Sequence, residues 1–235
     1  MSVKKSKIKL NKKIAQHLVK ADAWRLGPFI SSFGLEIPFD YDFRRIISSP
    51  RALKDLGDEM GKIAKKYHVN LIAGAETAGI PLAAAVSLAT NIPMVYARKD
   101  AKKHGMRKQI EGMWKKGDRA ALIDDSVASA RQKELFVKVL KKHGVSVPVI
   151  ITIAGSSQRS YPWMKQRGID LYYLCDRLAL LKYFYQQGKI PRSLFDVVKD
   201  AYGDFRVWIT NKDNLKKIEI EKKKKVNQHL LGSGY

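Results

Sequence analysis

Short apolar segments alternate with stretches of helical pattern along this chain, and this alternation constrains the fold more than any other feature. Strands that alternate with helices form βαβ units, which build a mostly parallel sheet with helices on its faces. The sequence therefore predicts an α/β fold. The expected strands are 69–73, 93–97, 119–123, 147–154 and 169–174, and the expected helices of the sheet region are 50–67, 80–89, 130–143 and 162–167.

Charged and hydroxyl side chains follow three of the predicted strands. They occur at the first, second and third strand ends along the chain. Parallel sheets bind their ligands beyond the carboxyl ends of the strands, so these side chains are the first candidates for a binding site. The candidates are Glu76, Thr77, Arg98, Lys99, Asp124, Asp125 and Ser126.

The segment 120–130, AALIDDSVASA, brings two adjacent acids to the end of a predicted strand. Small and hydroxyl residues fill the turn that follows, and a helix then begins, so backbone N–H groups there are suited to a phosphate. Asp124 and Asp125 beside that phosphate suit a vicinal diol or a hydrated divalent cation, and ribose 5-phosphate carries both a phosphate and a diol. The alternative is that the acids only cap the helix.

Residues 98–112 form a polar, basic segment bounded by glycines. Its cations are suited to closing over a pyrophosphate and to stabilising the negative charge of a departing group. The alternatives are a solvated basic loop and a loop that contacts RNA. The turn GAETAG at 74–79, which precedes a predicted helix, is a weaker candidate anion site of the same kind.

These three motifs, in this order, resemble those of type I phosphoribosyltransferases, and specifically the orotate branch, over about residues 20–203. The Arg-Lys pair at 98–99 with Lys102, His104 and Gly105 is similar to the family's mobile loop. The resemblance implies a type I phosphoribosyltransferase fold, in which a mostly parallel sheet is flanked by helices. We expect a phosphoribosyltransferase domain over 1–205, with a small hood over about 20–48. The basic residues beyond the region of resemblance lead us to expect a separate basic C-terminal extension over 206–235.

The resemblance also implies a reaction: orotate displaces pyrophosphate from phosphoribosyl pyrophosphate and gives orotidine 5′-monophosphate, a step of pyrimidine (UMP) biosynthesis. Asp124 and Asp125 are then expected to hold the ribose hydroxyls and to act in catalysis with Lys102. Mg²⁺ is the expected cofactor, held by the two acids only indirectly, through the substrate. A homodimer that shares loop 98–112 between sites is expected. The implied substrate-binding residues are Arg98, Lys99, His104, Glu76, Thr77, Ser126, Ser129 and Arg159.

Three departures from the family pattern keep other functions open. Ala128 and Ala130 stand where the family's phosphate turn has Thr and Gly, no basic residue precedes Gly34 in the early hairpin, and Arg159 alone stands for an Asp-Arg pair. The alternatives are a divergent, non-catalytic protein that binds nucleotides or nucleic acid, and a transferase for another base.

The net charge of +23 over 235 residues suggests a polyanionic partner. Residues 1–20 hold seven lysines and no acid, and 206–225 hold eight basic and three acidic residues, so nucleic acid is a candidate partner of the termini.

Cys175 is the only cysteine, which excludes an internal disulfide and suits a reducing cytosol. No apolar run approaches the roughly 18 residues that would span a bilayer. We therefore expect no membrane span, and the single cysteine leads us to expect a cytoplasmic protein. A hairpin is expected at 207–209 and 218–220.

Overall fold

The computed structural model describes residues 10–30, 36–99, 109–127, 131–157 and 161–203, together with Lys216 and Ile220. The chain divides into two compact units. The first unit comprises Met1–Ala21 and Phe43–Arg177, and the second comprises Asp22–Asp42 and Leu178–Tyr235. All the described candidate site residues belong to the first unit.

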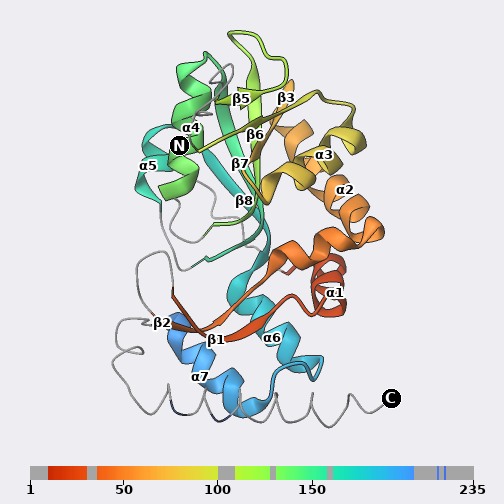
Figure 1. Ribbon diagram of the computed structural model, residues 1–235, viewed down its shortest axis with the longest axis vertical. Coiled ribbons are helices and arrows are strands. Elements are labelled where there is room, and N and C mark those ends of the chain that lie inside the picture. Colours follow the sequence, from red (N-terminus) through yellow and green to blue (C-terminus); the bar gives the residue numbers. More distant parts are fainter. Residues whose placement is uncertain are drawn as a thin grey trace. The chain divides into compact units, whose positions relative to one another are not determined.

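A six-stranded sheet in the order β5-β4-β3-β6-β7-β8 forms the centre of the first unit (Figure 1). Neighbouring strands are parallel except for β5, which runs antiparallel to β4. The mostly parallel sheet predicted from the sequence is therefore confirmed. The strands are β3 (Leu71–Ala75), β4 (Met94–Ala97), β5 (Ile110–Glu111), β6 (Arg119–Ser126), β7 (Ser146–Gly155) and β8 (Asp170–Asp176).

Helices cover both faces of this sheet, with α4 and α5 on one side and α2 and α3 on the other (Figure 1). Leu122 of β6 belongs to a buried cluster with Phe136 and Leu140 of α4. The predicted start of α2 is confirmed: the side chain of Ser49 accepts a hydrogen bond from the N–H of Ala52 at 3.3 Å. The helices are α1 (Lys12–Lys20), α2 (Pro50–Lys66), α3 (Gly79–Thr90), α4 (Arg131–Lys142) and α5 (Pro162–Gln166), with a 3₁₀ helix at Phe43–Ser48.

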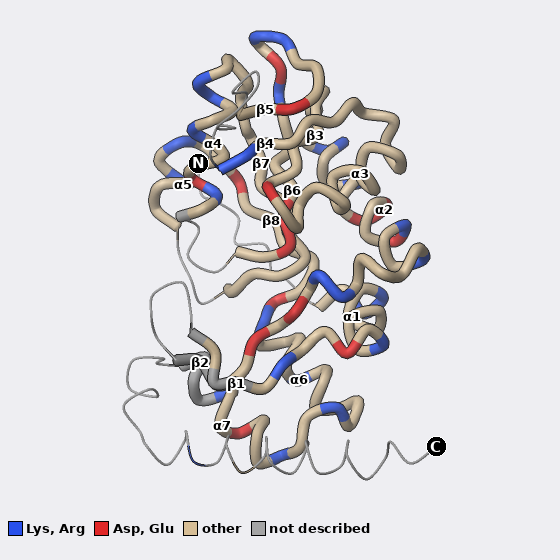
Figure 2. Tube along the Cα trace, viewed as in Figure 1, with Lys and Arg blue, Asp and Glu red and all other residues tan. Residues whose placement is uncertain are grey.

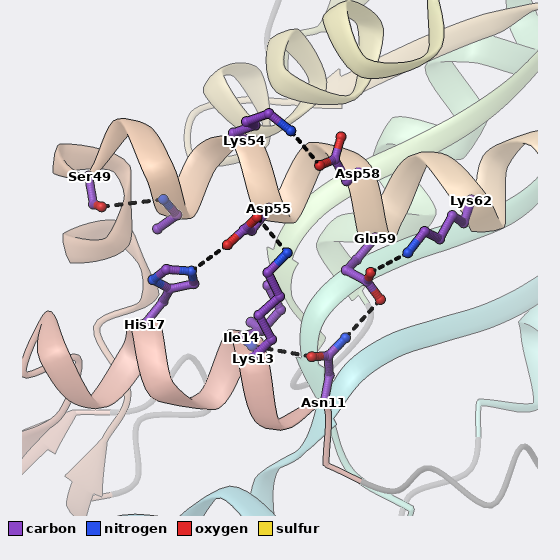
Figure 3. Close-up of polar contacts among 11 residues, drawn as sticks. Asn11, Lys13, Ile14, His17, Ser49, Lys54, Asp55, Asp58, Glu59 and Lys62 are labelled. Atoms are coloured by element: carbon purple, nitrogen blue, oxygen red, sulfur yellow. Dashed lines mark hydrogen bonds and ion pairs between the residues drawn. The ribbon is translucent and has the colours of Figure 1, made fainter.

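Polar side chains join α1 to α2 (Figure 3). The amide Nδ2 of Asn11 donates to Oε2 of Glu59 at 2.9 Å. Lys13 Nζ lies 2.6 Å from Oδ1 of Asp55, and His17 Nε2 lies 2.7 Å from Oδ2 of the same carboxylate. Since Asp55 is buried, the Lys13 ammonium and the hydrogen bond to His17 offset the loss of its hydration.

The second unit contains the hairpin of β1 (Arg25–Ile30) and β2 (Glu36–Asp40), which are antiparallel, with α6 (Arg177–Gln186) and α7 (Arg192–Gly203). Aromatic rings form its core. The ring of Phe39 stacks at 5.8 Å from Trp24 and meets Tyr41 edge-on at 4.8 Å, and Tyr41 lies 6.1 Å from Phe184 of α6. Apolar burial of such large rings contributes strongly to stability.

Some segments differ from the sequence-based prediction. β6 continues to Ser126, beyond the predicted end at residue 123, because it pairs with β7 as far as Ser126 and Ala154. β5 lies inside the predicted loop. Ile220 is helical, so the strand predicted at 218–220 is wrong at that residue, while 207–209 lies outside the described residues. The predicted domain boundary at residue 205 also lies outside them and stays a prediction.

Within the described ranges, none of the helices combines the length and the apolar character needed to span a membrane.

Candidate active site

Charged residues of the parallel strands lie near the strand ends, and the middle of each strand carries none (Figure 2). In β6 the apolar run ends at Ile123, and Asp124, Asp125 and Ser126 complete the strand. Successive side chains of a strand point to opposite faces. Asp124 therefore shares the face of Leu122, which packs against α4, and Asp125 lies on the other face.

Asp124 is buried and forms an ion pair with Lys133 of α4, which is also buried. Its Oδ2 contacts the Lys133 ammonium, and its Oδ1 accepts a hydrogen bond from the N–H of Asp125 at 2.8 Å. Burial raises the pKa of Asp124 to about 6, the nearby Asp125 adds to the rise, and Lys133 opposes it. Both oxygens of Asp124 are thus already bound by the protein.

Two cationic residues follow β4, beside acids from the neighbouring strands. Arg98 Nη2 lies 3.5 Å from Oε1 of Glu76, and Arg98 Nη1 lies 3.9 Å from Oε1 of Glu111 on β5. The backbone N–H of Lys99 donates to Oε2 of Glu76 at 3.2 Å, while the Lys99 side chain is exposed. Arg98 Nε is buried without a hydrogen-bond partner among the described residues, so one guanidinium donor remains available.

The turn between β3 and α3 lies against the end of β6. A Cβ atom placed on Gly79 would be 2.3 Å from the carbonyl oxygen of Ile123, which only a glycine permits. The N–H of Glu76 donates to the carbonyl of Ala97 at 3.1 Å, which ties the same turn to β4. β4, β3 and β6 are neighbours in the sheet, so their polar residues meet at one edge.

An acidic residue at the end of β8 organises the turn after β7. Gly155 and Asp176 are opposite each other in the paired strands, and the N–H of Ser157 donates to Oδ2 of Asp176 at 2.8 Å. Asp176 is itself buried. The carboxyl ends of β6, β7 and β8 therefore all carry polar groups.

Several known enzymes have sequences similar to this chain. The orotate phosphoribosyltransferase of Dinoroseobacter shibae is 30% identical over 187 residues, which cover 77% of this chain and 83% of that protein. This chain belongs to the orotate phosphoribosyltransferase family. The bovine uridine 5′-monophosphate synthase is also 30% identical, over 184 residues, but the chain spans only 38% of its length.

The solved structures agree with membership in the orotate phosphoribosyltransferase family. The UMP synthase of Leishmania donovani superposes with a TM-score of 0.73 at 26% identity, over 81% of this chain and 42% of that one. The predicted type I phosphoribosyltransferase fold is thereby confirmed. No protein-family profile matches the chain.

The structure describes seven of the residues that the resemblance to orotate phosphoribosyltransferases assigns to substrate, and it brings them to the ends of three adjacent strands. Lys102, His104, Ser129 and Arg159 lie outside the described residues. The seven are Glu76 and Thr77 after β3, Arg98 and Lys99 after β4, and Asp124, Asp125 and Ser126 at the end of β6.

Sequence reasoning missed Lys133 and Glu111 as members of this site. Lys133 had a usable signal, because it lies on the helix face of Phe136, Val137 and Leu140, where a charged residue needs a partner. Glu111 had no usable sequence signal, since its contact with Arg98 depends on the pairing of β5 with β4.

The residues present fit a magnesium ion that arrives with an orotate phosphoribosyltransferase substrate. Among the described residues there is no group of three or more His, Cys, Asp or Glu side chains that could hold a metal. Mg²⁺ typically needs only one or two protein carboxylates when substrate oxygens and waters supply the rest. Asp125 is a partly exposed carboxylate of this kind.

Proposed function

We propose that this protein transfers the phosphoribosyl group from phosphoribosyl pyrophosphate to orotate, giving orotidine 5′-monophosphate and pyrophosphate in pyrimidine biosynthesis. The observation that carries the proposal is the meeting of cations and acids at the ends of β4, β3 and β6. The substrate combines a diol with a 5′-phosphate and a pyrophosphate, so the diol requires hydrogen-bond acceptors and the phosphate groups require cations. Membership in the orotate phosphoribosyltransferase family supports orotate as the acceptor base.

In the proposed reaction, the bond between the sugar C1 and the pyrophosphate oxygen breaks, and a bond from C1 to a ring nitrogen of orotate forms. That nitrogen loses its proton to the solvent or to the leaving pyrophosphate. Negative charge develops on the leaving pyrophosphate. Arg98 and Lys99 after β4 would stabilise that charge, and Lys102 and His104 would add to it from the adjoining segment. Mg²⁺ bound with the substrate would supply further positive charge against the pyrophosphate.

The sugar and its 5′-phosphate would bind at the start of α4. Asp125 would accept hydrogen bonds from the ribose hydroxyls, and Ser126 and Ser129 would line the phosphate turn. The first N–H groups of a helix have no partner within it and attract anions, so α4 supports this placement. Glu76 and Thr77 would line the pyrophosphate side, and Arg159 would contact the base.

The decisive assay mixes purified protein, Mg²⁺, phosphoribosyl pyrophosphate and orotate, and follows the loss of orotate absorbance. Uracil, hypoxanthine, guanine and adenine in place of orotate test a transferase for another base. An Asp125→Asn variant should lose turnover. The matched control is Asp58→Asn, which removes a partly exposed carboxylate on α2 and should retain turnover. No turnover of orotate by wild-type protein at saturating substrate would refute the proposal.

Assembly and location are part of the same proposal. Family membership supports a homodimer whose loop 98–112 serves the neighbouring site, and sedimentation of the purified protein tests the dimer. The single cysteine favours a reducing compartment, which supports a cytoplasmic location.

The charge of the termini favours nucleic acid as an additional partner. Net charge is +23, and residues 1–20 contain seven lysines without an acid. Binding through phosphate groups weakens steeply with salt. Retention of RNA or DNA that falls sharply between low and physiological salt would support this role, and undetectable retention at low salt would refute it.

A further inference from the structure

A buried ion pair joins β6 to α4, the two elements that flank residues 128–130 in the sequence. Asp124 is near the end of β6, and Lys133 is in the first turn of α4, so residues 128–130 lie between them in sequence. Each of the two residues is only 6% exposed. The pair therefore connects the strand to the helix across the segment that is proposed to hold the 5′-phosphate.

A buried ion pair costs free energy of hydration, so it is an unusual way to hold a strand to a helix. Two charges that leave water lose their hydration, and a well-packed apolar pair of similar volume is often as stable. The neighbouring contacts are apolar, because Leu122 and Phe136 on the same elements pack in the buried cluster. An apolar pair at positions 124 and 133 would fit these apolar surroundings. The presence of charged residues there instead favours a role for them in the site.

The two adjacent acids differ in what they contact. Asp124 has one oxygen on Lys133 and the other on the N–H of Asp125. Asp125 lies on the opposite face of β6 and is partly exposed. Among the described residues, no side chain or backbone N–H is hydrogen-bonded to the Asp125 carboxylate. A ligand at the strand end thus meets one acid that is already bound and one that is available.

We propose that Lys133 is a positioning residue that holds Asp124 as an internal brace, so that Asp125 alone of the two acids presents its carboxylate to the sugar of the substrate. This inference rests on the proposed function for the identity of the ligand. It replaces the expectation that both acids hold the ribose hydroxyls. Lys133 acts on the substrate indirectly, by fixing the end of β6 relative to the start of α4.

The brace is tested first without any ligand, by a double-mutant cycle in urea. Lys133→Met and Asp124→Leu each leave one buried charge without its partner, and the double variant replaces the pair by apolar side chains. The double variant should unfold at a higher urea concentration than either single variant. Losses that simply add would show that the two residues are not coupled and would overturn the proposal.

Steady-state kinetics then separates positioning from direct contact. Lys133→Met should lower kcat/KM for phosphoribosyl pyrophosphate on the order of tenfold to a hundredfold, since the site shifts. Lys133→Arg, which retains the charge, and the double variant should each recover much of that loss. Asp125→Asn should remain impaired by on the order of a hundredfold or more while its urea midpoint changes little. A folded double variant as impaired as Asp125→Asn would overturn the proposal.

A spectroscopic measurement on wild-type protein tests the proposal even if the variants fail to fold. With ¹³C-labelled aspartate, addition of phosphoribosyl pyrophosphate and Mg²⁺ should shift the carboxyl resonance of Asp125 more than that of Asp124. A larger shift of Asp124 would overturn the proposal. Wild-type protein without orotate turnover would instead refute the proposed function, and the urea cycle would still decide whether Lys133 braces Asp124.

Discussion

The imidazole Nε2 of His17 lies 2.7 Å from Oδ2 of Asp55, which joins the N-terminal helix α1 to α2. Lys13, one turn earlier on α1, holds the other oxygen of the same carboxylate. One acid on α2 thus contacts two side chains of α1, an ammonium and an imidazole (Figure 3). The packing of α1 against α2 within the first unit therefore depends on the ionised form of Asp55.

Acid should weaken this contact. Hydrogen bonds from Lys13 and His17 lower the pKa of Asp55 from 3.8 to about 2. Because the folded-state pKa lies below the unfolded value, the contribution to stability is present above about pH 4 and is lost as the pH falls towards 2. Asp55→Ala should lower the free energy of unfolding by about 1–3 kcal/mol at neutral pH and flatten its decline below pH 4. Urea unfolding at several pH values measures both effects, with Asp58→Asn as control.

Asp124 should give the opposite pH dependence. Burial raises the pKa of Asp124 to about 6, above the value of a solvated Asp. The folded state then binds a proton that the unfolded state has lost, so stability falls as the pH rises from about 4 to 6. Urea midpoints of wild type and Asp124→Asn across this range test the sign. A wild-type advantage that grows with pH between 4 and 6 would contradict it.

Gly79→Ala should disturb the strand ends without introducing backbone strain. The added Cβ would lie 2.3 Å from the carbonyl oxygen of Ile123 and push α3 away from β6. We expect a loss of about 1–3 kcal/mol in the free energy of unfolding and reduced turnover. Gly168→Ala is the control, because it has open space but a φ of +63°. The control should lose about 1 kcal/mol and retain turnover.

Arg98→Lys should be nearly as damaging as Arg98→Met. The guanidinium of Arg98 reaches acids on two sides, Glu76 at 3.5 Å and Glu111 at 3.9 Å, and a lysine ammonium lacks that planar fork. Both variants should lower kcat/KM for phosphoribosyl pyrophosphate on the order of a hundredfold. Steady-state rates measure this loss. An active Arg98→Lys variant would show that charge alone suffices.

The strands and helices of the sheet region can be predicted from sequence, because each is marked by a pattern within its own residues. Short and almost entirely apolar runs, typical of buried strands, identify β3 and β7. Ser49 before Pro50 identifies the start of α2. The site region follows from the rule that ligands bind at the carboxyl ends of parallel strands. Asp124 and Asp125 are therefore placed correctly at a strand end by sequence alone.

The contacts within the site require the folded chain. Glu111 reaches Arg98 only because β5 pairs back on β4, and a two-residue strand leaves no periodic pattern in the sequence. The pleat of β6 points Asp124 to the α4 face of the sheet and so determines its partner. The strand predicted from sequence ends at residue 123, so it does not assign Asp124 to either face. Ile220 shows the limit for the C-terminal segment, where an apolar alternation predicted a strand and the residue is helical.

Neither outer strand of the sheet presents a long row of free backbone groups along its whole length. At one side β5 is only two residues long, and at the other the N–H of Asn11 donates to the carbonyl of Leu174 in β8 at 3.0 Å. A long open strand is a template for adding a strand from another molecule, and short or covered ones prevent it. A pair of these chains is thus expected to associate through side-chain surfaces rather than through a sheet continued from one copy into the next.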